Sequence, residues 1–547
     1  MNRRDFIKLS LFSPMIKVGT GLAVSSAMVT AQAAPSSGYK ALVVLMLDGG
    51  NDAMNTFIPT ESTPHQHYFN IRTGSDREAE NIGIAIANLD DSSSGSSRFT
   101  TDTNGHYIKN SSTNHPYFDA TQAEDGLATS AIRSYRKGCY HMTQGSTNQA
   151  SGLGINAMMP EFAAMYKEGK LSLVSNVGTL VKPTTQAQIN NDSAELPVFL
   201  FAHNHQQRAV WTAQAEKLAK TGWAGRIADA WSLNAPVGLN ISYWDKNLSM
   251  VGESTSPLKM PTGDTVAFNT KHIVANFTRG DKFEKLLERF NKEGIARENA
   301  FSQYYSQQIK NAGELSILLT EAMQSAPDFS TFTAKNSYGQ PLFTIPDMAN
   351  DFKLIMHDAT KEGIFEQLEA CAKMIKVGKD TLGYNRQIFY VRMPGFDTHT
   401  NQSAGHADLL RSLSVALSDF QKALEEMGVD DKVLTVSLSE FGRTLLNSGD
   451  GSGHGWGGHS FMISGDSTFN GGNVFGTVLD DLRLDGINTH TAKGRIIPTT
   501  SVEQMLAPAL KWFGVEDELM STILPNLSNF RTNENDAESA FLQNVFS

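Results

Sequence analysis

Six short apolar runs stand out along the chain, and most of them are continuously apolar rather than alternating with polar residues. Strands that are buried on both faces of a sheet have this pattern. The runs are ALVVLML (41–47), LSLVSNV (171–177), PVFLFA (197–202), QIFYVRM (387–393), KVLTVSL (432–438) and HSFMIS (459–464). We therefore predict six strands in the interior of an α/β protein.

Helical patterns lie between some of these runs. Residues 281–324 and 406–428 carry apolar residues at spacings of three and four, which is typical of helices with one buried face. Alternation of strands and helices predicts a doubly wound, mainly parallel sheet flanked by helices. The length of 547 residues would allow two or three domains, but one large α/β domain over residues 40–530 fits equally well.

Residues 84–150 differ from the rest of the chain. They are rich in Ser, Thr, Asn and Gly and have few apolar anchors. This composition predicts a polar surface insertion.

The N-terminus has the organisation of a signal peptide over residues 1–33. Arg3 and Arg4 precede Phe-Ile-Lys, an apolar stretch follows, and Ala31-Gln32-Ala33 has the small residues of a cleavage site. The arginine pair resembles a twin-arginine signal, so we expect the twin-arginine export machinery to deliver a periplasmic or secreted protein. An N-terminal membrane anchor is the alternative, although polar residues interrupt the apolar stretch.

Composition narrows the class of protein further. Without the signal, which carries four basic residues and one acidic residue, the net charge changes from −11 to −14. An acidic, unpatterned surface argues against nucleic acid as a partner. No later apolar run is long enough to span a bilayer. Cys139 and Cys371 could form at most one disulfide.

Three of the predicted strands run into a carboxylate. Asp48 follows residues 41–47, Asp397 lies shortly after 387–393, and Glu440 lies shortly after 432–438. Ligands of open α/β sheets bind at the carboxyl ends of the strands, and clustered carboxylates there would repel one another without a cation. His454 and His459, in the glycine-rich stretch GSGHGWGGHSFMISG, follow the third strand. Mixed carboxylate and histidine ligands favour a divalent metal, with zinc first and manganese or calcium as alternatives.

Each of these residues also has a plain structural interpretation. Asp48 could form a turn or cap a helix, DTH (397–399) could be a turn, and Glu440 could pair with Arg443. The two glycine-loop histidines could be surface turn residues. His406 fits the start of a helix better than it fits a metal ligand. The metal hypothesis rests on the coincidence of the three strand ends.

The ordered motifs LDGGNDAMNTFIP, FAHNHQQRAVW, GWAGRIAD, GFDTHTNQ, SEFGR, the Gly/His loop and GRIIPTTSVEQMLAPALKWFGV resemble the bacterial domain of unknown function 1501 family, over roughly residues 40–515. That family is grouped with the alkaline phosphatase/sulfatase superfamily. The resemblance implies an alkaline phosphatase-like fold with a divalent metal centre at the strand ends.

By position, the resemblance implies five metal ligands, for which the sequence offers six candidate residues. Asp48 matches the ligand of the first strand, and Asp397 with His399 matches an Asp/His pair whose usual spacing is longer. Glu440 stands where an Asp followed by His is usual, although Phe441 follows it here. Either His454 or His459 would supply the late histidine.

The nucleophile of this superfamily is a Ser, Thr or modified Cys after an early strand. The corresponding segment here has Ala202, which has no nucleophilic atom, followed by His203 and His205 as candidate ligands or general bases. Hydroxyl alternatives are Thr179, Thr184 and Thr185. We expect a metal-dependent hydrolase of phosphate or sulfate esters, with a small molecule or a polymer as substrate. The alternative is a non-catalytic exported protein that retains the fold for metal binding or assembly.

Overall fold

The computed structural model describes residues 38–73, 81–89, 135–231, 239–263, 317–346 and 359–547, with short gaps at 137, 146 and 245–246, and a few isolated residues elsewhere. The predicted signal peptide, most of residues 90–134 and most of the predicted helix over 281–324 lie outside the described residues.

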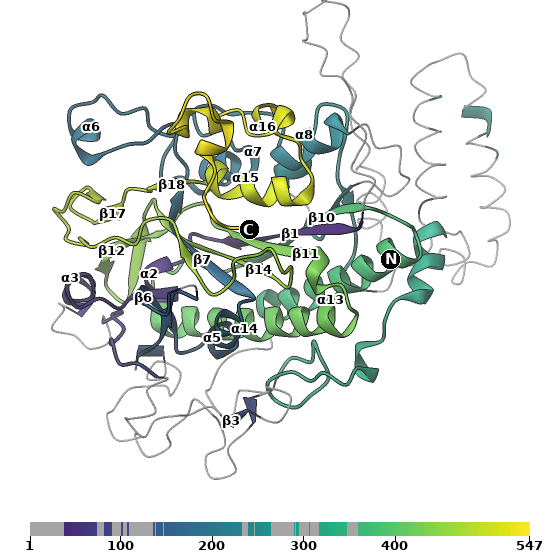
Figure 1. Cartoon of the computed structure of the whole chain (residues 1–547), viewed down its shortest axis with the longest axis horizontal. Coiled ribbons are helices and arrows are strands. Elements are labelled where there is room, and N and C mark those ends of the chain that lie inside the picture. Colours follow the sequence, from purple (N-terminus) through teal and green to yellow (C-terminus); the bar gives the residue numbers. More distant parts are fainter. Residues whose placement is uncertain are drawn as a thin grey trace, which may run out of the picture.

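A nine-stranded sheet forms the centre of the protein (Figure 1). Its order is β15-β7-β14-β11-β1-β10-β8-β9, and β18 also pairs with β7. All pairs are parallel except those that the antiparallel strand β14 makes with β11 and β7. The strands are β1 (Lys40–Asp48), β7 (Leu171–Gly178), β8 (Asn240–Ser242), β9 (Leu258–Lys259), β10 (Arg386–Pro394), β11 (Val433–Leu438), β14 (Gly458–Ser464), β15 (Val474–Phe475) and β18 (Thr500–Ser501). The predicted α/β class with a mainly parallel sheet is confirmed.

Helices cover both faces of this sheet, as Figure 1 shows. One face packs against α5 (Pro160–Lys167), α13 (Ala359–Asp380) and α14 (Gln402–Glu426). The other face packs against α8 (Trp223–Ala230), α15 (Val502–Phe513) and α16 (Asp517–Ile523). Alternate residues of β1 enter the two cores: Val43 and Leu45 lie in the first, and Val44 and Met46 in the second. Burial on both faces explains why β1 is continuously apolar.

Smaller elements surround the sheet. Three of them are two-stranded ribbons and one is a three-stranded sheet with the order β2-β6-β5. The strands are β2 (Phe57–Pro59), β3 (Thr100–Thr101), β4 (Tyr107–Ile108), β5 (Cys139–Thr143), β6 (Ala150–Asn156), β12 (Arg443–Ser448), β13 (Gly451–His454), β16 (Thr489–His490) and β17 (Arg495–Ile496). Other α-helices in the described part of the chain are α2 (Ala53–Thr56), α3 (Ser62–Thr73), α6 (Gln186–Asn190) and α7 (His203–Thr212). No helix in the described parts of the chain is both long and apolar enough to cross a membrane.

Five of the six predicted strands are confirmed, and the strand predicted at 197–202 is wrong. That segment turns at Phe199 and Phe201, whose φ angles of 52° and 75° are left-handed, and α7 begins directly afterwards at His203. Left-handed backbone cannot continue an extended ladder. Phe199 is also 60% exposed, so this apolar run forms part of the surface.

Two further expectations are refined by the fold. The helix predicted over 406–428 is confirmed as α14, but it begins at Gln402, so His406 lies inside the helix and is fully buried. The end of the predicted polar insertion forms β5, and its Cys139 and Tyr140 belong to the core. Cys139 and Cys371 are both buried free thiols, and the structure forms no disulfide between them.

Candidate metal centre

The three strand-end carboxylates lie on neighbouring strands. In the order β11-β1-β10 all pairs are parallel, so the carboxyl ends of the strands meet at one edge of the sheet. Asp48 is the last residue of β1, Asp397 lies three residues after the end of β10, and Glu440 lies two residues after the end of β11. This arrangement is the one that the strand pattern predicts.

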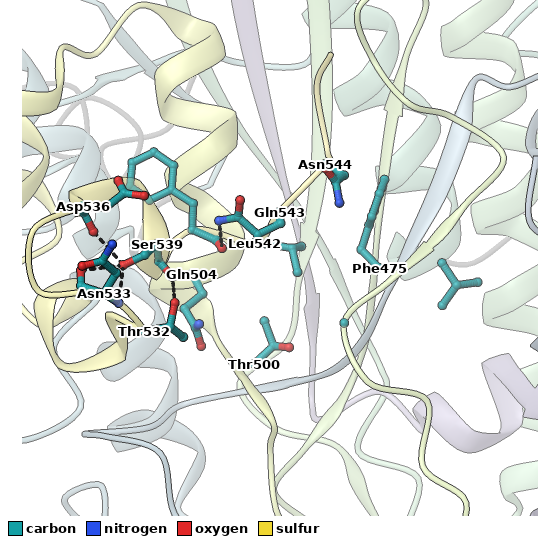
Figure 2. A pocket seen from close by; sticks show the side chains of 13 residues that line it. Phe475, Thr500, Gln504, Thr532, Asn533, Asp536, Ser539, Leu542, Gln543 and Asn544 are labelled. Carbon is teal, nitrogen blue, oxygen red and sulfur yellow. Dashed lines mark hydrogen bonds between the residues drawn. The ribbon is translucent and has the colours of Figure 1, made fainter. Parts of the chain in front are cut away.

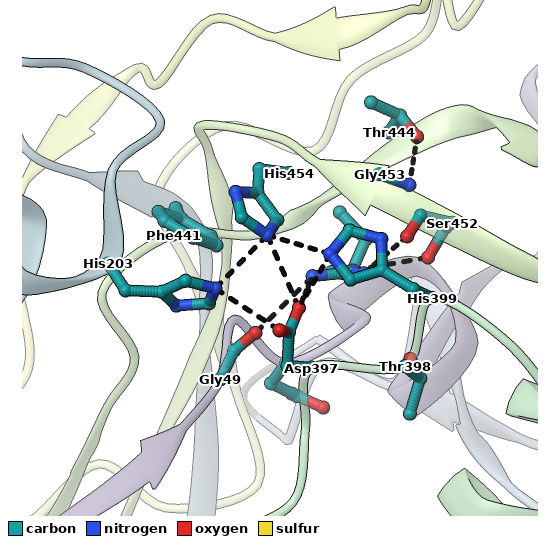
Figure 3. Close-up of polar contacts among 12 residues, drawn as sticks. Gly49, His203, Asp397, Thr398, His399, Phe441, Thr444, Ser452, Gly453 and His454 are labelled. Atoms are coloured by element: carbon teal, nitrogen blue, oxygen red, sulfur yellow. Dashed lines mark hydrogen bonds and ion pairs between the residues drawn. The ribbon is translucent and has the colours of Figure 1, made fainter.

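Four side chains form a compact cluster at this edge (Figure 3). The Nε2 atom of His454 lies 3.0 Å from Nε2 of His203 and 2.9 Å from Nε2 of His399. The Asp397 carboxylate lies 3.0 Å from His399, 3.3 Å from His454 and 3.4 Å from His203. Of the residues that the structure describes, His203, Asp397 and His454 offer ligand atoms that all lie within 4.8 Å of one another.

Hydrogen bonds on the far side of two imidazoles assign their tautomers. Nδ1 of His203 lies 2.8 Å from the Glu440 carboxylate, and Nδ1 of His454 lies 2.9 Å from the carbonyl oxygen of Phe201. Both partners are acceptors, so both Nδ1 atoms carry a hydrogen. When both rings are neutral, their Nε2 lone pairs point at each other. Metal-binding histidines are oriented by the same kind of outer hydrogen bond.

The cluster fits a divalent ion. Zinc–nitrogen bonds of 2.0–2.1 Å place neighbouring ligands of a tetrahedral site about 3.3 Å apart, close to the separations of 2.9–3.4 Å in the cluster. Two imidazoles and one carboxylate, from His203, His454 and Asp397, are ligands that zinc accepts, and His399 lies beside this group in contact with His454 and Asp397. A proton competes with an ion for this position, because the hydrogen bond that His203 donates to Glu440 raises the pKa of His203.

Arginines compensate two of the three carboxylates. Buried Arg443 donates to Asp397 at 2.7 Å, and Arg392 pairs with Asp48. Burial alone would raise the pKa of Asp397, but the hydrogen bond and charge of Arg443 lower it overall. The expected repulsion between the carboxylates is therefore relieved by the protein itself, and the argument for a metal rests on the facing imidazole nitrogens.

Asp48 and Glu440 thus lie around the cluster rather than in it. Asp48 also accepts a hydrogen bond from Gln207. Glu440 accepts from the backbone N–H of Gly49 at 2.9 Å and orients His203. The alternative pairing of Glu440 with Arg443 is not the one observed, because the guanidinium of Arg443 contacts Asp397.

Phe441 shapes the cluster by packing. Its ring lies 4.8 Å from the rings of both His203 and His454, and it is stacked on His454. The side chain that replaces the usual histidine therefore fixes two candidate ligands instead of adding one.

Two predicted histidines lie away from the cluster. His459 is buried, its Nδ1 accepts from the backbone N–H of Asn176 at 3.1 Å, and burial lowers its pKa to about 4. His205 packs against Phe199, with ring centroids 4.3 Å apart. The structure brings together only His203, Asp397, His399 and His454 of the eight predicted site residues.

The hydroxyl alternatives are used elsewhere. Thr179 donates to Gln206 at 2.5 Å, and Thr185 caps α6 with Gln188. Ala202 occupies the N-cap of α7 next to His203. His406 contacts Tyr135 and Asn51 in the buried interior and is neither a helix-start residue nor a member of the cluster.

A separate cavity of about 730 Å³ lies beside the C-terminal segment (Figure 2). It is lined by residues such as Thr500, Gln504 and Asn533, and by none of the four cluster side chains. Polar groups around it bond to the protein, as Ser539 does to the carbonyl oxygens of Asn533 and Asp536. The candidate chemistry lies at the sheet edge and not in this cavity.

The sequence pattern did not predict a role for Gln402, whose side chain hydrogen-bonds to both segments that carry candidate ligands, 397–399 and 452–454. Its Oε1 accepts from Thr398 at 3.2 Å and from Ser452 at 2.6 Å. Thr398 separates Asp397 from His399, and Ser452 lies two residues before His454. Gln402 is fully buried, so neither bond is exchanged with water.

We expect Gln402→Leu to weaken zinc binding by about 10–100-fold, since outer-shell partners of metal ligands contribute at this level. Competition with a chromophoric chelator would measure the dissociation constant. Gln421→Leu is the matched control, because Gln421 is a buried glutamine of the same helix, remote in sequence from the ligands. Equal zinc affinity of the two variants would contradict the positioning role.

Comparison with known proteins supports the family that the motifs resemble. Residues 353–493 match the family described as "Protein of unknown function (DUF1501)". The matched region contains Asp397, His399 and His454, whereas His203 lies outside it. No curated protein sequence matches the chain.

One solved structure, titled "Crystal structure of Ps i-CgsB", aligns with 68% of this chain and 72% of its own. The identity is 9% and the TM-score is 0.26, a similarity too low to carry an argument about fold or function.

Proposed function

We propose that this chain is an exported, metal-dependent hydrolase of phosphate or sulfate esters with an alkaline phosphatase-like fold. The carrying observation is the solvent-facing cluster in which the Nε2 atoms of His203 and His399 each face Nε2 of His454 beside Asp397. The side chains of His399 and Asp397 are 49% and 43% exposed, so substrate and water can reach the site. Structural zinc sites are closed, whereas catalytic ones keep a position open.

The charge of the site favours an anionic substrate. Asp48, Asp397 and Glu440 with Arg392 and Arg443 carry a net charge of −1 when the histidines are neutral. A divalent ion would change this to +1, which attracts a phosphate or sulfate group.

Each residue of the site has a separate role in such a reaction. A bound divalent ion would polarise the ester and lower the pKa of a water molecule. His203, Asp397, His399 and His454 would hold it. Glu440 keeps the Nε2 lone pair of His203 directed at the site, and His399, the most exposed of the three histidines, is placed to exchange a proton with solvent if it is released as a ligand.

Ala202 favours the second candidate, a non-catalytic exported metal-binding or assembly protein. A methyl group stands at the position where the superfamily's nucleophile is expected, so a covalent intermediate cannot form there. Hydrolysis would then require direct attack by water. The twin-arginine motif at Arg3 and Arg4 supports export for both candidates.

The two candidates are separated by one preparation of exported protein. Purification from the periplasm without chelator, N-terminal sequencing and elemental analysis should give a chain that begins near Ala34 with bound zinc, manganese or calcium. Turnover of an aryl phosphate or aryl sulfate should cease with chelator and return with the metal. A fully metal-loaded protein with only the background rate would refute the hydrolase and leave the binding protein.

A further inference from the structure

The motif GRIIPTT contains an arginine that the proposed reaction has not yet used. Arg495 lies on β17, and its Nε donates to the backbone carbonyl of His454 at 2.9 Å. Its guanidinium lies over the ring of Phe201, 3.8 Å from the centroid. The carbonyl of Phe201 is in turn the acceptor for Nδ1 of His454. Arg495 is thus attached at two points to the surroundings of one candidate metal ligand.

Arg495 differs from the other two arginines of this region in its partners. Arg392 and Arg443 are paired with Asp48 and Asp397. Within the described part of the chain, no carboxylate forms an ion pair with Arg495. Arg495 is half-buried, so its positive charge is partly desolvated. Partial burial of a charge is unfavourable unless a partner is supplied, so a ligand anion would stabilise it.

The geometry also prepares the guanidinium for an anion. The Nε bond and the contact with the Phe201 ring hold the guanidinium in place, and within the described residues its Nη groups donate no hydrogen bond, which leaves donors for bidentate binding of phosphate or sulfate oxygens. Phe201 is held in left-handed backbone at a φ of 75°, a conformation that is costly for an aromatic residue and that persists at functional sites.

We propose that Arg495 binds the anionic oxygens of the substrate ester beside the metal centre. This inference rests on the proposed function and deepens it. Arg495 would raise the charge of the metal-loaded site from +1 to +2. A doubly charged phosphate monoester therefore matches the site better than a phosphate diester or a sulfate ester, which carry one negative charge.

Inorganic phosphate is the probe, and calorimetry on the zinc-loaded protein measures its binding without any hydrolysis. Arg495→Gln should weaken phosphate binding by at least about tenfold, because a charge-assisted bidentate contact is lost. The zinc dissociation constant should not change. Arg495→Lys, which keeps the charge, should retain part of the phosphate affinity. Arg483→Gln is the control, since Arg483 precedes the same hairpin and pairs with Asp481.

Phosphate affinity that is equal in wild type and Arg495→Gln would overturn the inference. A lower zinc affinity in both Arg495→Gln and Arg495→Lys would also overturn it, because Arg495 would then serve to position His454. Ester turnover by the wild-type protein is a separate measurement. If it is present while Arg495→Gln binds phosphate normally, the inference fails and the hydrolase stands. If metal-loaded wild type shows no turnover, the hydrolase itself fails.

Discussion

His454→Gln is expected to abolish zinc binding and ester hydrolysis together while the sheet stays folded. His454 contacts all three other members of the cluster, so its loss removes the central ligand. Zinc affinity should fall by more than about 100-fold, because even outer-shell changes cost 10–100-fold. Chelator competition and the aryl phosphate assay would measure the two effects.

His67→Gln is the matched control. The side chain of His67 is 25% exposed and that of His454 is 23% exposed, and His67 lies beside Asp481, outside the cluster. Unchanged zinc affinity in His454→Gln would show that the cluster does not hold the ion.

Asp397→Asn would be a less clean experiment. The structure pairs Asp397 with Arg443, which is only 2% exposed. Removal of the carboxylate charge leaves the buried guanidinium of Arg443 without its only ion-pair partner among the described residues, which lowers the stability of the fold. Loss of metal in this variant could therefore not be separated from loss of fold, whereas His454 carries no compensating charge in its neutral form.

The strands could be predicted because a strand that is buried on both faces has a continuously apolar sequence. β1, β10 and β11 are mainly apolar, and a carboxylate at or just after the end of each strand lies at the ligand edge of the sheet. PVFLFA has the same apolar composition but forms a surface turn. Composition could not distinguish the two, since the left-handed φ of Phe199 and Phe201 depends on tertiary contacts.

The sequence alone could not predict which of the candidate histidines reach the cluster. His203 and His205 are two residues apart in one helix, so their side chains point in different directions, and only His203 reaches the cluster. His454 and His459 are five residues apart but belong to β13 and β14, which lie in different sheets. Only the register of those strands decides which of the two faces the carboxylates.

The ion pairs of Arg392 and Arg443 with the strand-end carboxylates could not be predicted from the sequence either. Arg392 lies within β10 and looks like an interruption of an apolar strand, and Arg443 looks like a local partner of Glu440. Parallel pairing of β10 with β1 brings Arg392 to Asp48, and the β12-β13 hairpin brings Arg443 to Asp397. Contacts between residues this far apart in the sequence leave no local pattern.

The second large effect concerns stability rather than the metal. Asp419 is fully buried in α14, and burial raises its pKa from 3.8 to about 8. The charges around it act in both directions: Lys422 and Arg411 lower the pKa, and Glu161 raises it. One carboxyl oxygen accepts from the backbone N–H of Phe343 at 2.8 Å, and the other has no hydrogen-bond partner among the described residues.

The sign of the pH effect follows from proton binding. Between about pH 4 and pH 8 the folded protein keeps a proton on Asp419 that the unfolded chain has released, so this group lowers stability as pH rises. Above pH 8 the effect is complete. A shift from 3.8 to about 8 corresponds to a loss on the order of 5 kcal/mol at alkaline pH.

Asp419→Asn should remove this loss, because the amide keeps an acceptor for Phe343 and has no proton to release. Relative to wild type, we expect the variant to gain several kcal/mol in free energy of unfolding between pH 5 and pH 9, consistent with the linkage value of about 5 kcal/mol. Urea unfolding of both proteins with chelator present would measure it without interference from metal ligands. Asp431→Asn, at an exposed aspartate paired with Lys432, is the control and should shift stability equally at both pH values. Parallel pH profiles of wild type and Asp419→Asn would show that Asp419 is ionised in the folded protein at neutral pH, and that its unpartnered oxygen is solvated in a way that its burial does not suggest.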